Sequence, residues 1–371
     1  MASSLKLAYQ IVVGCRRRCL PKPPIFLPDS TESVGDREPW TSLGATVTSH
    51  PYPTKFVMNQ DKTEQGTVRT DTRALARAIE SFAQSDGDYQ TAIPGLSLHR
   101  RCLPTEPLHC IFNLGLGVVA QGHKQALVDG QMNTYGPGQS MVTTIDLPVI
   151  SHVTSASLKE PLLGLMLTLE PRRVQEVAAG MKLSLPARAQ PCRTLSIETL
   201  AAPLVQALVR LVSLLGESPL LIAWVAPLLQ EEIIARLLLG PHGQQLQHLV
   251  ADGTPSQQIA KAVRWLKQNF AKPLQVDDLA TSVHMSSTSF RQHFRKMTGT
   301  SPLQYQKTLR LQEARQLMLT QQLDAGKASG LVGYESPSQF SREYSRLFGA
   351  PPQADVRRLR IRSVPANPSR A

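Results

Sequence analysis

Apolar side chains recur at helical spacing in two stretches of the chain that lie fifty residues apart. In each stretch a serine precedes an amphipathic segment, which ends at a glycine that is followed three positions later by a proline. The matching positions are Ser286, Phe290, Phe294, Met297, Gly299 and Pro302 in the first copy, and Ser336, Phe340, Tyr344, Leu347, Gly349 and Pro352 in the second. Because serine favours helix N-caps and glycine favours C-caps, the pattern predicts the same capped helix twice.

Polar and basic residues occupy the face of each predicted helix opposite its aromatic residues. These candidate DNA-contacting residues are Ser287, Thr288, Arg291, Gln292 and Arg295 in the first copy, and Ser338, Gln339, Arg342 and Arg346 in the second. Shorter helical patterns precede both copies, at 276–283 and 324–332. A helix, a turn and a capped helix make up the helix-turn-helix plan, whose second helix enters the DNA major groove. We expect Gln292 to suit adenine and Arg342 to suit guanine.

A long helix predicted over 302–320 separates the two units, with Ser301 as its N-cap and proline at its first position. A rigid spacer would hold two reading helices about one turn of DNA apart, roughly 34 Å. We expect Arg295 and Arg346 to contact phosphates, which set affinity but not sequence. The last arginines are either further phosphate contacts or part of a solvated tail; they are Arg357, Arg358, Arg360 and Arg362.

The pattern upstream changes to short alternating runs between residues 93 and 169. Strand-like runs lie at 109–114, 118–119, 125–128, 140–145, 149–155 and 162–169. Asp129-Gly130 is a strong hairpin signal, and Gly136-Pro137-Gly138 marks another turn. These runs predict a small β-sandwich or barrel, flanked by helices over 70–85 and 171–180.

Residues 194–251 carry two apolar patterns at helical spacing, around Leu208 and around Ile233. They predict a helical hairpin, which either packs on the strand domain or forms a dimerisation surface; the two interpretations are compatible. Residues 252–255 then form a predicted hinge. The expected fold class is therefore α+β, with a strand-rich domain over 58–253 and an all-α domain over 254–371. The first helix of the second domain is expected to begin at a Ser256 cap.

Charge strengthens the DNA-binding hypothesis, because the net charge of +12 is unevenly distributed. Residues 255–371 hold 18 of the 40 Lys and Arg residues but only 7 of the 28 Asp and Glu residues. A basic region of this kind attracts polyanions. The five cysteines are odd in number and irregularly spaced, which does not fit a disulfide scaffold and indicates a reducing, cytoplasmic compartment. No run of 18 apolar residues predicts a membrane span.

The first 57 residues have a different character from the rest of the chain. Residues 20–57 are rich in Pro, Ser and Thr and lack periodicity, which predicts disorder. Arginines follow the short N-terminal apolar stretch instead of preceding it, which is the wrong order for a secretory signal. We therefore hypothesise that Met58 is the native start and that the preceding residues are an extension. Cys15 and Cys19 lack the further ligands that a zinc site needs.

Residues 256–360 resemble the DNA-binding region of the AraC/XylS family of bacterial transcription regulators. The matching residues are Ser286, Phe290, Phe294, Gly299, Ser301, Pro302, Arg310, Leu311, Ala314 and Arg315 in the first unit and spacer, and Val332, Gly333, Tyr334, Ser338, Gln339, Phe340, Ser341, Arg342, Phe348, Gly349, Pro351 and Pro352 in the second unit. Residues 93–180 resemble the cupin-like N-terminal domain of one branch of the family, through Glu106, Pro107, Leu108, Gly122, Lys124, Tyr135, Pro137, Gly138, Asp146, Leu147, Pro148 and Val149.

The resemblance implies a transcription activator that binds promoter DNA, contacts RNA polymerase and answers a small effector held in its N-terminal domain. It also implies base-reading roles for Thr288, Gln292, Ser338, Gln339 and Arg342. Ala328 and Ser329 depart from the family's large aliphatic residue and alanine, so the second unit is expected to be less stable.

A homodimer remains an expectation, and two other classes of protein remain as alternatives. One is a cupin-type metalloenzyme fused to a DNA-binding tail, and the other is an architectural DNA binder. His99, His109, His123 and His152 lack the spacing of the usual cupin ligand set, so we expect neither a metal, nor a cofactor, nor enzymatic activity.

Overall fold

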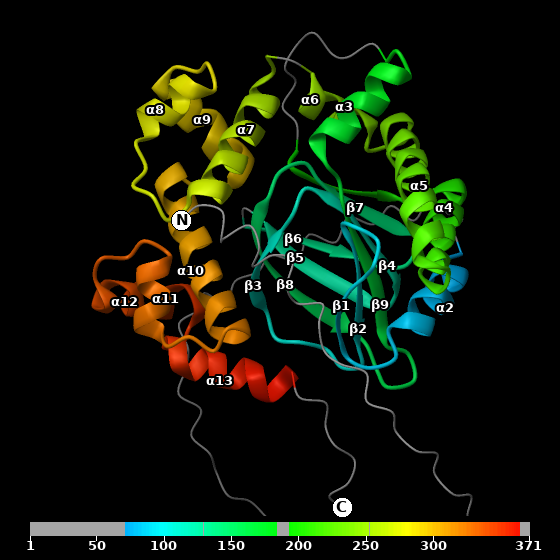
Figure 1. The fold of residues 1–371 in the computed structure, drawn as a ribbon, viewed down its shortest axis with the longest axis horizontal. Helices are drawn as coiled ribbons and strands as arrows, with labels where there is room; N and C mark the ends of the chain where they lie inside the picture. Colours follow the sequence, from blue (N-terminus) through cyan, green and yellow to red (C-terminus); the bar gives the residue numbers. More distant parts are fainter. Residues whose placement is uncertain (1–70, 129, 184–192, 252, 364–371) are drawn as a thin grey trace, which may run out of the picture. The chain divides into compact units, whose positions relative to one another are not determined.

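The computed structural model describes residues 71–128, 130–183, 193–251 and 253–363, which belong to one compact unit spanning residues 65–371 (Figure 1). The predictions made for residues 1–57, for a Met58 start and for Cys15 and Cys19 lie outside the described residues.

The strand-rich part consists of two antiparallel sheets (Figure 1). In spatial order the six-stranded sheet contains β1 (Gly87–Gln90), β2 (Leu96–Arg101), β9 (Leu162–Thr168), β4 (Gly115–Gln121), β7 (Gln139–Thr143) and β10 (Leu195–Thr199). The four-stranded sheet contains β3 (Leu108–Phe112), β8 (Leu147–Ser155), β5 (His123–Val128) and β6 (Gln131–Tyr135). The described strands thus form two separate sheets and do not close into a barrel. Of the two predicted architectures, the sandwich is confirmed.

Alternation along the strands explains how the sandwich holds together. In β8 the residues Leu147, Val149, Ser151 and Val153 are buried, whereas Pro148, Ile150, His152 and Thr154, which alternate with them, are half-buried. The prediction that 194–251 is entirely helical was wrong at its start, because Leu195–Thr199 forms β10. This strand completes the sheet by pairing antiparallel with β7, with Ile197 opposite Met141. A distant strand, not local helical spacing, determines the conformation there.

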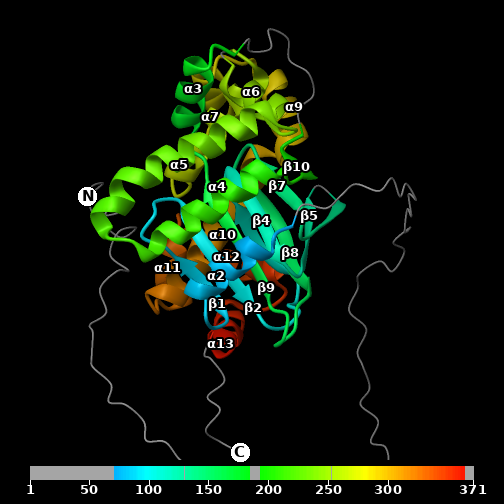
Figure 2. The same ribbon diagram turned by 90° about the vertical axis from the view of Figure 1, so that its right-hand side faces the viewer.

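A helical layer covers the outer face of the six-stranded sheet (Figure 2). The helices of this half are α2 (Arg73–Phe82), α3 (Pro171–Gly180), α4 (Ala202–Ser213), α5 (Pro219–Leu239) and α6 (Gly243–Val250). Leu75 and Ile79 of α2 and Leu208 of α4 are completely buried against sheet residues such as Leu98 and Leu116. The helical hairpin therefore packs on the strand domain, as the first interpretation of its sequence expected.

The last third is all-helical: the second unit has a small core of its own, whereas the buried residues of the first unit belong to a core that continues into the strand domain. Its helices are α7 (Pro255–Asn269), α8 (Val276–Ser282), α9 (Ser287–Thr298), α10 (Pro302–Thr320), α11 (Ala325–Leu331), α12 (Pro337–Phe348) and α13 (Pro352–Ser363). The N-cap predicted at Ser256 was wrong: Thr254 caps α7, and its side chain accepts a hydrogen bond from the Gln257 amide. Pro255 takes the first helical position, where its missing N–H costs nothing.

The alternative of a loosely solvated tail does not hold, because 352–363 forms helix α13, whereas phosphate contacts by its arginines stay a prediction. Pro352 begins the helix, and Asp355 in its first turn is completely buried. Arg358 pairs with this carboxylate, and Arg360 donates to the Met318 carbonyl. Both arginines are exposed, yet each is bound to a partner within the protein.

None of the described helices is both long and apolar enough to span a membrane.

Candidate nucleic-acid interface

The two predicted reading helices are capped in the same way. The Ser286 hydroxyl accepts from the Ser289 amide at the start of α9, and the Ser336 hydroxyl accepts from the Gln339 amide at the start of α12, both at 3.3 Å. Gly299 and Gly349 end the helices with φ of +72° and +75°. These left-handed conformations favour glycine, because they bring a Cβ too close to the backbone. The duplicated capping pattern is thus confirmed.

Each reading helix is anchored by aromatic residues on its inner face. Phe290 and Phe294 are fully buried, and the ring of Phe294 meets that of Tyr305 of α10 at a centroid distance of 5.5 Å. In the second unit the Phe340 ring lies 5.3 Å from Tyr334 and 5.5 Å from Tyr344. The Phe294–Tyr305 and Phe340–Tyr334 pairs are edge-to-face, an arrangement that aromatic rings favour, and such contacts fix the rotation of each helix about its axis. The aromatic anchors therefore decide which residues of α9 and α12 face solvent.

The candidate DNA-contacting residues lie on the outward faces that this anchoring leaves. Ser287 is half-buried, and the others are exposed: Thr288, Arg291, Gln292 and Arg295 on α9, and Ser338, Gln339, Arg342 and Arg346 on α12. The structure thus brings the predicted residues onto one solvent-facing side of each helix, where base edges and phosphates can approach them.

Three of these side chains, those of Ser287, Arg291 and Gln339, already have partners in the protein. Arg291 pairs with Asp277 of α8 at 2.8 Å, and Gln339 donates to Glu343 at 3.1 Å. The Asp277 carboxyl has a lowered pKa, because it accepts a hydrogen bond from Ser287 and lies beside the Arg291 cation. Within the described part of the chain, Arg342 and Arg346 make neither a hydrogen bond nor an ion pair, so their guanidinium groups are available to DNA.

Arg310 of the spacer helix ties the two units together. Its guanidinium donates to the carbonyls of Phe270 (2.7 Å), Gly333 (2.8 Å) and Lys272 (3.0 Å). Gly333 has a φ of +86°, and a Cβ there would lie 2.2 Å from the Ala271 carbonyl oxygen, so only glycine fits. Sequence reasoning noted Arg310 only as part of the family resemblance, because its carbonyl partners are distant in sequence.

A buried polar network supports the second unit. The Asp355 carboxylate lies 2.8 Å from Nε and 3.1 Å from a terminal nitrogen of Arg315, and it accepts a 2.8 Å hydrogen bond from the Tyr344 hydroxyl. The Nε contact is an ion pair without hydrogen-bond geometry, whereas the terminal nitrogen makes a true hydrogen bond. The Arg315 guanidinium also stacks 4.3 Å from the Phe348 ring centroid.

The sheets contact the helical third through residues other than the candidate DNA-contacting ones. Lys267 of α7 pairs with Asp146 at 2.6 Å and donates to Asn113 at 3.1 Å. The Tyr305 hydroxyl donates to the Asp146 carbonyl at 2.7 Å, and burial raises the pKa of this phenol well above its usual value. In the second unit the Phe348 ring meets His109 of β3 edge-on. These contacts leave both reading faces open.

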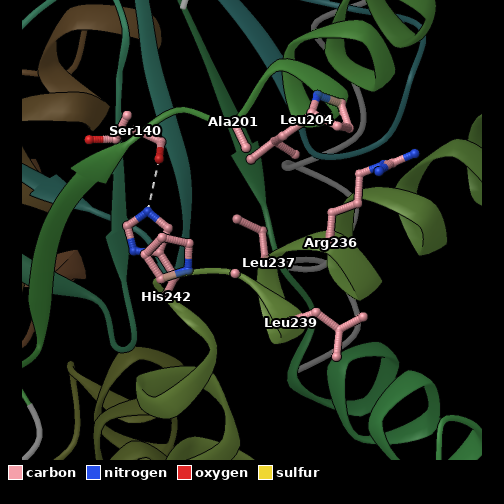
Figure 3. A pocket seen from close by; sticks show the side chains of 11 residues that line it. Ser140, Ala201, Leu204, Arg236, Leu237, Leu239 and His242 are labelled. Carbon is pink, nitrogen blue, oxygen red and sulfur yellow. Dashed lines mark hydrogen bonds between the residues drawn. The ribbon is translucent and has the colours of Figure 1, made fainter. Parts of the chain in front are cut away.

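A cavity of about 200 Å³ lies where the end of α5 meets β7 and the start of α4 (Figure 3). Its walls include Ser140, Ala201, Leu204, Arg236, Leu237, Leu239 and His242. The His242 ring nitrogens hydrogen-bond to the hydroxyls of Ser140 (2.9 Å) and Ser196 (2.8 Å). Burial lowers the pKa of His242 to about 4. The polar side chains of Ser140, Ser196 and His242 therefore hydrogen-bond to one another, which gives this site a structural role.

The histidines considered as metal ligands are separated in the structure. His99 bonds to Asp88 at 2.7 Å, whereas His109 packs against Phe348. Across the four described segments, no three or more His, Cys, Asp or Glu side chains are grouped as metal ligands.

Comparison with known proteins identifies both halves of the chain. Residues 92–245 match the family model of the AraC-type transcriptional regulator N-terminus, and residues 279–358 match that of a helix-turn-helix domain. The HTH-type transcriptional regulator GbdR of Pseudomonas aeruginosa is 31% identical over 108 residues, which are 29% of each chain. The RCS-specific HTH-type transcriptional activator RclR of Escherichia coli is 31% identical over 137 residues, 37% of this chain and 43% of that protein. The chain thus spans less than half the length of these relatives.

The fold is similar to that of a ToxT variant from Vibrio cholerae in its apo form, with a TM-score of 0.52 and 11% identity over 72% of this chain and 98% of that one. The two family models together cover well over half of the 371 residues, in the order that the sequence resemblance implied. This chain belongs to the AraC/XylS family of helix-turn-helix regulators.

Proposed function

We propose that the chain is a sequence-specific transcription activator, which binds promoter DNA through α9 and α12 and contacts RNA polymerase. The observation that carries the proposal is the repeated capped helix, anchored by aromatic rings and exposing polar residues in the basic third of the chain. The outward helix faces are suited to major-groove entry, and the excess positive charge favours approach to DNA.

The division of labour follows the two family models. Residues 58–253 hold a small effector and mediate homodimerisation, residues 254–371 bind DNA, and the protein acts in the bacterial cytoplasm. The contacts of Lys267 and Tyr305 with Asp146 provide a physical route between the two parts. The alternative of a metalloenzyme fused to a DNA-binding tail gains no support from the relatives, whose names are those of transcription regulators.

Arg342 and Arg346 of α12 are assigned different roles, base reading for Arg342 and phosphate binding for Arg346, and substitution of each tests the assignment. In the Arg342→Ala variant we expect the base preference at one position of the site to relax, with roughly tenfold or greater loss of discrimination, because a bidentate contact to guanine is removed. In the Arg346→Ala variant we expect all sequences to bind more weakly alike, with a salt dependence reduced by about one phosphate contact. Binding of the full chain to a library of single-base variants, at two salt concentrations, measures both effects.

Each arginine variant is the matched control of the other, because both residues are exposed on the same helix. An equal loss on every sequence in both variants would contradict the assignment of base reading to Arg342.

A further inference from the structure

The carboxylate of Glu343 lies on the flank of the reading helix α12, one turn beyond Gln339. The Glu343 side chain is only 18% exposed, whereas Gln339 is exposed. Its Oε1 atom accepts from Lys307 Nζ at 2.7 Å and from Gln339 Nε2 at 3.1 Å. Its Oε2 atom accepts from the Tyr334 hydroxyl at 2.8 Å. Donors from the spacer helix α10, from the segment before α12 and from α12 itself therefore bind one carboxylate.

The partners of Glu343 leave its carboxylate little freedom to move. Tyr334 is 8% exposed, and its ring lies 5.3 Å from the Phe340 ring and 5.9 Å from the Arg310 guanidinium. The Lys307 ammonium neutralises the negative charge, which would otherwise repel DNA from this side of the helix. Glu343 is thus a fixed acceptor for the Gln339 side chain.

Glu343 is ionised at neutral pH. Burial favours the neutral acid, but the hydrogen bonds that the carboxylate accepts from Lys307, Gln339 and Tyr334 outweigh it and lower its pKa. An ionised carboxylate has no proton to donate. The Gln339 side chain must therefore turn its NH2 group toward Glu343, which directs its carbonyl oxygen away.

A glutamine amide held in this orientation presents one acceptor and one donor side by side. One Nε2–H of Gln339 is bound to Glu343, and the other remains free beside Oε1. In the major groove adenine displays the complementary pair, the N6 donor and the N7 acceptor, whereas guanine displays two acceptors. The held amide therefore matches adenine and opposes its own oxygen to an acceptor of guanine.

The base-reading glutamine of the first unit, Gln292, lacks a partner of this kind. It is exposed, and among the described residues it makes no hydrogen bond. A free glutamine amide can turn over, and it has to be ordered when it binds. The two reading helices thus differ in the preorganisation of their glutamines.

We infer that Glu343 is a positioning residue of DNA recognition, which holds the Gln339 amide so that α12 selects adenine at one position of the site. The inference rests on the proposed function, because it concerns how α12 reads bases. It adds a residue that sets the specificity of another side chain.

Binding of the full chain to a library of single-base variants tests the inference through Glu343→Gln. The new side chain keeps an acceptor for Lys307 and Tyr334 but can also donate, so the Gln339 amide is free to turn over. We expect the preference for adenine at one position to fall roughly tenfold, with guanine gaining most. The position read by Arg342 on the same helix should keep its preference.

The control for the lost charge is Glu335→Gln, since Glu335 is exposed in the same unit; this variant should keep every base preference. The Gln339→Ala variant identifies the position that Gln339 reads, and adding Glu343→Gln to it should change no preference further. An unchanged adenine preference in the Glu343→Gln variant overturns the inference. Equal losses at the positions read by Gln339 and Arg342 also overturn it, because Glu343 would then only stabilise α12.

A measurement without DNA separates failure of this inference from failure of the proposed function. In the free full chain, NMR relaxation of side-chain amides should show the Gln339 NH2 group ordered on the picosecond-to-nanosecond timescale, and mobile in Glu343→Gln. Gln292 should be mobile in both proteins. A Gln339 side chain as mobile as Gln292 in the wild type overturns the inference, whatever the protein binds. An ordered Gln339 in a wild type without any sequence preference would instead contradict the proposed function.

Discussion

Replacing Asp355 by alanine is expected to destabilise the second helix-turn-helix unit by about 3–5 kcal/mol, which is the cost of removing one partner from a buried ion pair. Asp355 is completely buried and pairs with Arg315, which is only 9% exposed. Without the carboxylate, the guanidinium stays buried and uncompensated, and the Tyr344 hydroxyl loses its acceptor. The urea midpoint, together with hydrogen exchange of α12, measures the loss.

The control for Asp355→Ala is Asp277→Ala. Asp277 also pairs with an arginine, Arg291, but both side chains are largely exposed, at 69% and 52%. Exposed pairs contribute about 1 kcal/mol or less, because water screens them. We expect the Asp355→Ala variant to protect only the DNA segment read by α9, and the Asp277→Ala variant to protect the full site. Similar destabilisation by the two changes would show that the buried network does not support α12.

Acidification is expected to destabilise the sheet domain through His242 by about 3 kcal/mol between pH 6.5 and pH 4. Burial lowers the pKa of this histidine to about 4 in the folded protein, from 6.5 for the free side chain. Above pH 6.5 both states are neutral and the stability is complete. As the pH falls through this window the unfolded chain binds a proton that the folded chain excludes, so stability is lost until both are protonated below pH 4.

The variant that tests this pH dependence is His242→Gln, which can keep hydrogen bonds to Ser140 and Ser196 but does not titrate. The free energy of unfolding, measured by urea titration, should fall by about 1.4 kcal/mol for each pH unit of acidification in the wild type, beyond the fall seen in the variant. Burial also lowers the pKa of His248, so part of the slope remains in the variant. Parallel curves for wild type and variant would exclude His242 as the source.

The elements predicted correctly from sequence are those whose determinants are local. Ser286 and Ser336 begin their helices and Gly299 and Gly349 end them. Each cap is adjacent in sequence to the helix that it caps, so the residue types alone predict it. The strand Leu195–Thr199 was missed because its partner β7 lies more than fifty residues upstream, and pairing overrides the local apolar pattern. Helix α13 was missed for a similar reason, since Asp355 is held by Arg315 and Tyr344.

The candidate site shows the same division between local and long-range determinants. Helical periodicity placed Thr288, Gln292, Ser338 and Arg342 on exposed faces, where the structure has them. Periodicity gave no sign that Arg310 links the two units through backbone carbonyls. Every residue has a backbone carbonyl, so the sequence does not indicate which carbonyl accepts a hydrogen bond. Only the folded structure shows contacts of this kind.

The most direct measurement is selection of DNA sites by the full-length protein from a random oligonucleotide pool at moderate salt, with bulk competitor DNA present. The account predicts enrichment of one defined site, with two sequence-constrained segments about 10 bp apart, one for each reading helix. Recovery of sequences no different from the starting pool would contradict the claim that α9 and α12 read DNA together.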